Sequence, residues 1–118
     1  MHRVLCSAVA VVFAGTLLAG CGGNHNTEDF SINATVVNGH PAFSAATITV
    51  TQGDKVNISV GNTTGEAHGF SIDQFNVHQV VQPGHHQAVS FTPNATGQFR
   101  IYCQLHPAHV PSRLIVVG

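Results

Sequence analysis

Three residues near the C-terminus have the side chains and the spacing of a transition-metal site. Cys103, His106 and His109 fall within seven residues, in the segment Cys-Gln-Leu-His-Pro-Ala-His. A thiolate and two imidazoles favour copper or zinc over magnesium or calcium, which prefer oxygen ligands. Pro107 and Pro111 restrict the backbone here, and a stiff loop holds its donor atoms in place with or without a metal. The alternative is a cysteine in the core with histidines facing solvent.

Short β-strands must position these residues. From residue 30 onward, runs rich in Val, Ile, Thr and Phe alternate with turns of Gly, Pro and Asn, and no long helical period is visible. The expected strands cover 32–37, 46–51, 55–60, 67–72, 80–81, 88–92, 98–103 and 114–117. About seven or eight strands in a chain of this length predict an all-β fold of the β-sandwich type.

The two-residue period of a strand places further side chains. Cys103 shares a face with Phe99 and Ile101, so it points into the core as its strand ends. His68 is in phase with Phe70, so it can project inward from a second strand. We therefore expect His68 to meet the donors of the C-terminal loop.

A hairpin is expected from strands 88–92 and 98–103, joined across Pro-Asn-Ala-Thr-Gly. It would bring His85 and His86 to the same end of the sandwich as Cys103. These two histidines have two interpretations, an exposed turn or a second, weaker site for copper acquisition or proton relay.

The first twenty residues have the layout of a secretory signal. A short basic start precedes an apolar run, which ends in Leu-Ala-Gly before Cys21. This ending resembles a bacterial lipobox, in which Cys21 becomes the lipidated N-terminus; the alternative is a plain signal peptide with an incidental cysteine. We expect a signal peptide over 1–20, a lipidated tether over 21–29 and a domain over 30–118. The protein would be an exported bacterial lipoprotein, periplasmic or on the extracytoplasmic face of a membrane.

Charge and histidine content narrow the possible partners. After cleavage the chain keeps three basic residues and five carboxylates, so it has no basic patch for nucleic acid. The basic residues are Lys55, Arg100 and Arg113. Eight of the nine histidines remain, an excess that points to metal binding.

Several segments resemble the cupredoxins, over about residues 47–118. The likeness is greatest to the nitrosocyanins, red proteins with one copper, through Gly-Phe-Ser-Ile-Asp at 69–73 and Cys-Gln-Leu-His-Pro at 103–107. Next come the copper domains of nitrous oxide reductase and of cytochrome c oxidase subunit II. The resemblance implies a Greek-key β-sandwich with copper at one end.

The departures from the family pattern constrain the site. One loop cysteine excludes a dinuclear thiolate site, and Met1 leaves with the signal, so an axial thioether is excluded too. The resemblance implies Cys103, His106, His109 and His68 as ligands of one copper, with His68 at the place of the nitrosocyanin glutamate. For His109 the alternative is an exposed loop histidine. Glu66, two residues before His68, is either a displaced ligand or a solvated loop carboxylate.

The function expected from this site is single-electron transfer by a membrane-anchored copper protein, a carrier rather than an enzyme. Its partner would be a small redox protein or a membrane oxidoreductase docking near His106. Two other functions stay open: a copper-dependent redox catalyst or nitric oxide-binding protein, as in the nitrosocyanins, and a copper chaperone or scavenger.

Overall fold

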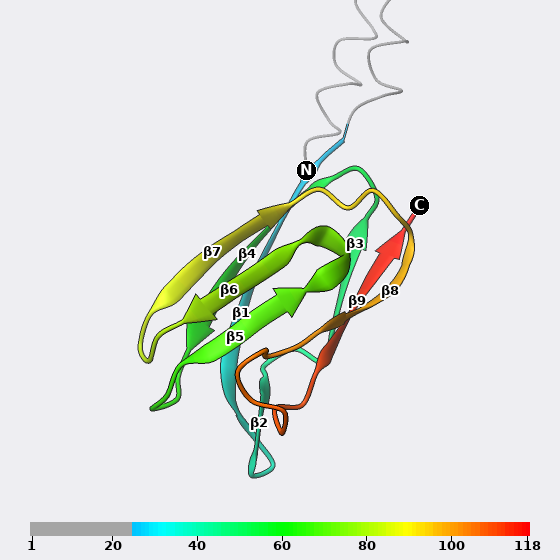
Figure 1. The fold of residues 1–118 in the computed structure, drawn as a ribbon. Helices are drawn as coiled ribbons and strands as arrows, with labels where there is room; N and C mark the ends of the chain where they lie inside the picture. The colour runs from blue at the N-terminus through cyan, green and yellow to red at the C-terminus, as the bar shows by residue number, and fades with distance from the viewer. Residues whose placement is uncertain (1–24) are drawn as a thin grey trace, which may run out of the picture.

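The computed structural model describes residues 25–118, which are nearly all β (Figure 1). The strands are β1 (Thr27–Val37), β2 (His40–Phe43), β3 (Thr47–Thr51), β4 (Lys55–Asn62), β5 (His68–Ile72), β6 (Val77–Val81), β7 (His86–Phe91), β8 (Gly97–Ile101) and β9 (Ser112–Val117), with one 3-10 turn, η1 (Asp73–Phe75). Within this part of the chain, no helix has the length and apolar character needed to cross a bilayer.

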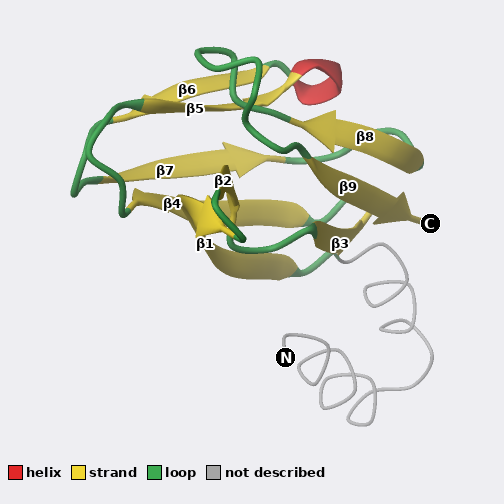
Figure 2. Ribbon diagram, turned by 90° about the horizontal axis from the view of Figure 1, so that it is seen from below, coloured by secondary structure: helices red, strands yellow, loops and turns green. Residues whose placement is uncertain are grey.

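The nine strands form a sandwich of two layers. One layer is the sheet β2-β1-β4-β7; the other contains β3-β9-β8 and the pair β5-β6. Ser71 and Tyr102 join β5 to the end of β8 by two backbone hydrogen bonds of 2.8 and 3.0 Å. Figure 2 shows β5, β6 and β8 in one layer and β1, β4 and β7 in the other. The pairs β1–β4 and β3–β9 are parallel, so the chain crosses between layers. The predicted β-sandwich is confirmed.

The core forms because the strands alternate as the sequence predicted. In β4, for example, Val56, Ile58 and Val60 are fully buried while Lys55 and Ser59 face solvent. The buried faces of both layers form one apolar cluster. It comprises Ile32, Ala34, Phe43, Ile48, Val50, Val56, Ile58, Val60, Phe70, Ile72, Val77, Val81, Val89, Ile101, Leu114 and Val116.

The predicted hairpin of strands 88–92 and 98–103 is wrong. β7 pairs with β4 and β8 pairs with β9, so the two strands lie in different layers. Their connection passes from one layer to the other, and the carbonyl of the buried Pro93 accepts a hydrogen bond from Gly53 N–H at 2.9 Å. The alternation of apolar and polar residues predicted that each strand is half-buried, but it did not predict which strand pairs with it.

The first two strands also differ from expectation. β1 begins at Thr27, within the predicted tether, because Thr27 to Asp29 continue the parallel pairing with β4. β2 was not predicted, since its sequence does not alternate and includes Pro41, which an edge strand tolerates. Asn38 and Gly39, with φ of 51° and 80°, form the tight turn that folds β2 back onto β1.

Candidate metal centre

Cys103 follows directly after the bridge that fastens the end of β8 to β5. Its side chain is buried, with 5% of its surface exposed, in the phase expected from Ile101. The backbone N–H of Gly69 donates a hydrogen bond to Cys103 Sγ at 3.1 Å. A backbone N–H aimed at a ligand atom is an outer contact of the kind that orients metal ligands. Cys103 is the one free cysteine among the described residues.

Two imidazoles from different elements face this sulfur. His68, the first residue of β5, is buried and places Nδ1 3.9 Å from Cys103 Sγ. His106, in the β8–β9 loop, places Nδ1 3.5 Å from the same atom. One donor atom from each of the three residues lies within 4.8 Å of the others. Ligand atoms at roughly 2.0–2.3 Å from a common ion have such separations, so the three donors fit one metal.

His109 lies beside this group, and the alternative of an exposed loop histidine is wrong, since the residue is 3% exposed. Its ring centroid is 5.1 Å from that of His68 and 4.4 Å from that of Phe43. Nδ1 lies 3.1 Å from the carbonyl oxygen of Val110, which only accepts, so the proton belongs on Nδ1 and the lone pair on Nε2. Nε2 is buried and has no hydrogen-bond partner in residues 25–118. A buried lone pair of this kind is what a fourth ligand would offer.

Burial keeps two of these imidazoles neutral. Desolvation lowers the pKa of His68, the neighbouring His106 lowers it further, and Glu66 acts in the opposite direction. Desolvation also lowers the pKa of His109; the hydrogen bond to Val110 opposes this, and the other two histidines add to the decrease. Because a metal binds neutral imidazole, both rings are in their ligating form at neutral pH.

Backbone contacts fix the loop that carries His106 and His109. The N–H of His109 donates to the carbonyl of His106 at 3.1 Å and closes a turn across Pro107. The N–H of Val110 donates to the carbonyl of Pro41 in β2 at 2.8 Å. The strand that the sequence did not predict therefore anchors the far end of the ligand loop.

Gln104 is a positioning residue that the sequence analysis missed. Its amide oxygen accepts a hydrogen bond from Ser71 Oγ at 2.6 Å, and its amide nitrogen donates to the carbonyl of Gln79 at 3.0 Å. These two hydrogen bonds are referred to below as the Gln104 clamp. The side chain thus lies across Gly69, where an added Cβ would overlap the Gln104 amide. The signal in the sequence was the glycine itself, because a glycine inside a strand often marks a close approach of another group.

A cavity of about 530 Å³ opens above the donors and reaches His68 and His106. One wall is apolar, with Val36, Pro41 and Ala108; the other is the β4–β5 loop. The His106 ring is partly exposed here, with 32% of its side chain accessible. The centre therefore lies just beneath the surface.

Glu66 projects from the β4–β5 loop and is 68% exposed, as a solvated carboxylate would be. However, Oε1 lies 2.7 Å from His106 Nε2, the ring nitrogen opposite the one that faces Cys103. Glu66 thus contacts the centre from beyond the His106 ring and is not part of the close group of donors.

The remaining predicted residues lie elsewhere. His85 and His86 are exposed near the end of β4, where Asn62 N–H donates to the carbonyl of His85 at 3.1 Å. Both side chains are exposed, and neither belongs to the group of His68, Cys103 and His106. Cys21 and the predicted signal over 1–20 lie outside the described residues.

The sequence matches the family of cupredoxin-like domains over residues 8–116. The chain belongs to this family. The cupredoxin is 32% identical to nitrous-oxide reductase from Cupriavidus necator over 78 residues, which cover 62% of this chain and 12% of that protein. It therefore spans about an eighth of the length of this relative.

Solved copper proteins share the fold. Copper nitrite reductase from Nitrosomonas europaea has a TM-score of 0.66 at 18% identity, over 76% of this chain and 41% of that one. Auracyanin A, a blue copper protein from the green thermophilic photosynthetic bacterium Chloroflexus aurantiacus, has a TM-score of 0.62 at 16% identity, over 77% of this chain and 99% of its own. At these identities the likeness shows the fold alone. Family membership and the group of His68, Cys103 and His106 together fit a single copper, as predicted.

Proposed function

We propose that this cupredoxin carries single electrons at the exported face of a bacterial membrane. One copper would be held by His68, Cys103, His106 and His109. The observation that supports this most directly is the convergence of three donor atoms within 4.8 Å, beside the unpaired Nε2 of His109. Copper supplies a one-electron couple, Cu(I)/Cu(II), at donors of this softness.

The contribution of the protein is to hold the donors still. Hydrogen bonds tie the ligand loop and its start to three strands. The Gln104 clamp holds it to β5 and β6, and the bridge between Ser71 and Tyr102 adds a second link to β5. The hydrogen bond from Val110 to Pro41 holds its far end to β2. A frame that moves little between oxidation states favours fast electron transfer, and fixed outer contacts orient the ligands.

The exposed edge of His106 is the proposed docking point. Three exposed apolar side chains lie near it. Val36, which lines the cavity, is 59% exposed, and in the ligand loop Leu105 is 43% and Val110 47% exposed. A small apolar contact of this kind suits a transient partner, such as a small redox protein or a membrane oxidoreductase. A lipid on Cys21 would keep the protein at the membrane where that partner acts.

A second candidate function is supported by the cavity above His68 and His106. An opening of this size would admit a small molecule to the copper, as a redox catalyst or a nitric oxide-binding protein requires. A closed coordination sphere that includes His109 would count against this function.

Copper titration and voltammetry of the full-length protein test the proposal. We expect one tightly bound copper and a reversible one-electron wave. Absence of copper binding, or several weakly bound ions, would overturn the carrier function, and a spectral change on addition of nitric oxide would favour the second candidate. Cys21→Ala tests the anchor separately, since it should move the protein from the membrane to the soluble fraction.

A further inference from the structure

The His106 ring lies between a metal-binding sulfur on one side and a carboxylate on the other. Its Nδ1 faces Cys103 Sγ at 3.5 Å, and its Nε2 lies 2.7 Å from Glu66 Oε1. An ionised carboxylate only accepts hydrogen bonds, and a neutral imidazole carries one proton. The contact to Glu66 therefore places the proton on Nε2 and leaves the lone pair on Nδ1, the nitrogen that faces the other ligands.

The loop that presents Glu66 is anchored by a buried side chain. Asn62 is 3% exposed, and its amide nitrogen donates to the carbonyls of Glu66 and Val81 at 2.8 and 2.9 Å. Its amide oxygen accepts from the N–H and the hydroxyl of Thr64 at 2.9 and 2.7 Å. All four hydrogen-bonding positions of the Asn62 amide are filled. Glu66 thus extends from a fixed backbone although its own side chain is exposed.

We propose that Glu66 is a positioning residue of the copper centre. It fixes His106 in the tautomer that presents Nδ1 to the copper, and its negative charge makes that nitrogen a stronger donor. The inference rests on the copper site proposed above. Among the residues that line the cavity, Glu66 is the one carboxylate, so no second acidic group there would replace it.

The pair should affect the copper far more than the fold. Glu66 is 68% exposed, and an ion pair in such a position contributes little to stability. Loss of a carboxylate behind a ligating histidine, in contrast, costs about 10- to 100-fold in metal affinity. A stronger donor favours Cu(II), so its loss should also raise the reduction potential, by about 59 mV for each tenfold loss of Cu(II) affinity relative to Cu(I).

Three variants of the full-length protein test this inference. Glu66→Ala removes both the acceptor and the charge, whereas Glu66→Gln keeps an acceptor oxygen without the charge. Asp29→Asn is the matched control, because it removes one exposed carboxylate far from the copper site. Asp29 lies near the start of β1, whereas Val36, which lines the cavity, lies near the end of that strand. The readouts are the imidazole ¹⁵N spectrum of the metal-free protein, the Cu(II) dissociation constant, the reduction potential and the melting temperature.

We expect the parent and Glu66→Gln to carry the His106 proton on Nε2, and Glu66→Ala to show a mixture of tautomers. Cu(II) affinity should fall about 10- to 100-fold in Glu66→Ala and by less in Glu66→Gln, with melting temperatures close to the parent. The inference fails if Glu66→Ala matches Asp29→Asn in tautomer and affinity, or if its melting temperature falls in step with its affinity. A parent protein that binds no copper would overturn the proposed function, while the ¹⁵N spectrum would still decide whether Glu66 sets the tautomer.

Discussion

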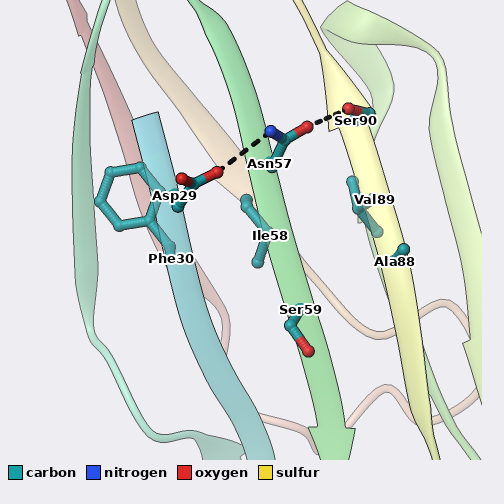
Figure 3. A pocket seen from close by; sticks show the side chains of 8 residues that line it. All are labelled: Asp29, Phe30, Asn57, Ile58, Ser59, Ala88, Val89 and Ser90. Carbon is teal, nitrogen blue, oxygen red and sulfur yellow. Dashed lines mark hydrogen bonds between the residues drawn. The ribbon is translucent and has the colours of Figure 1, made fainter. Parts of the chain in front are cut away.

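Two hollows in the surface of the sandwich differ in how their polar groups are used. One, of about 280 Å³, lies on β1, β4 and β7, where Asp29, Asn57 and Ser90 form a row (Figure 3). Asn57 Nδ2 donates to Asp29 Oδ1 at 3.0 Å, and Ser90 Oγ donates to Asn57 Oδ1. The other hollow is lined by His68 and His106 of the metal centre. His109 lies next to His68, and its Nε2 has no hydrogen-bond partner among the described residues.

The difference shows what distinguishes a binding site from a polar surface. In the first hollow, referred to below as the outer hollow, donors and acceptors of neighbouring strands satisfy one another and leave little for a ligand. At the metal centre, soft and borderline donors from β5 and the β8–β9 loop approach a common point instead of pairing off along neighbouring strands. Convergence of metal-binding atoms on one point, and not the presence of polar side chains, marks the site.

Of the changes that test this comparison, Cys103→Ser should have the largest effect on copper binding. Serine keeps the approximate volume but replaces a soft thiolate with a hydroxyl, so the centre should lose copper affinity by more than the roughly 100-fold that outer contacts contribute. Thiolate-to-copper charge-transfer absorption should vanish altogether. Copper titration followed by optical absorption measures both. Retention of the absorption band would place the thiolate ligand elsewhere.

His109→Met tests whether the unpaired Nε2 closes the coordination sphere. Methionine would convert the set to two histidines, a cysteine and a weak thioether, as in blue copper sites. If His109 is a ligand, the change should raise the reduction potential, by about 59 mV for each tenfold loss of Cu(II) affinity relative to Cu(I), and deepen the blue absorption. Unchanged spectra and potential would show that the fourth position does not involve this residue.

Gly69→Ala tests the frame around the donors. The new Cβ would overlap the Gln104 amide, so the strand or the clamp must shift, at a cost of about 1–3 kcal/mol. In a domain of this size that corresponds to a fall in melting temperature of roughly 4 °C or more. Thermal unfolding followed by circular dichroism measures it.

Two further variants control this prediction. Gly65→Ala adds the same methyl group in the preceding loop, where nothing lies within 4 Å, and should change stability little. Gln104→Ala removes the overlapping amide, so the double variant should be more stable than the sum of the single changes predicts. Equal effects of Gly69→Ala and Gly65→Ala would contradict the clamp.

The sequence predicted the parts of the centre that follow from strand period and residue type. Cys103 and His68 point inward because each is in phase with buried neighbours, and strand phase alone gave His68 as the partner from another strand. The family resemblance added its expected role as a copper ligand. Gln104 and the Glu66–His106 pair could not be found in this way. Their roles depend on which loops lie next to each other, and the period of a strand carries no information about that.

The mistaken hairpin has the same origin. Strands 88–92 and 98–103 have the alternation and the turn residues of a hairpin, but a half-buried strand fits either layer of a sandwich. What separates them is the pairing of β7 with β4 and of β8 with β9, contacts between segments distant in the sequence. β2 was missed for the opposite reason, since Pro41 weakens the strand signal and only the neighbouring β1 makes the segment extended.

Acid should destabilise the metal-free protein through the buried histidines. Folding lowers the pKa of His68 and of His109 below the usual value of about 6.5, so the unfolded chain takes up protons first as the pH falls. The stability is therefore complete above about pH 6.5 and declines below it. Melting temperatures between pH 7.5 and 5.5 measure this, and saturating copper should reduce the decline because the bound rings resist protonation. A metal-free His68→Gln, His109→Gln variant that declines as steeply as the parent would contradict the assignment.

The smallest effect is expected from Asn57→Ala, in the outer hollow. Its partners are exposed and can bond to water, so the loss should be about 1 kcal/mol or less. Asn62→Ala, on the same strand, provides the contrast, because it removes hydrogen bonds from the buried end of β4 and releases the loop of Glu66, at a cost of about 1–3 kcal/mol. Copper affinity should change only in the second variant. A change in reduction potential with Asn57→Ala would mean that β4 transmits strain between the hollows, and the outer row would then belong to the support of the metal centre.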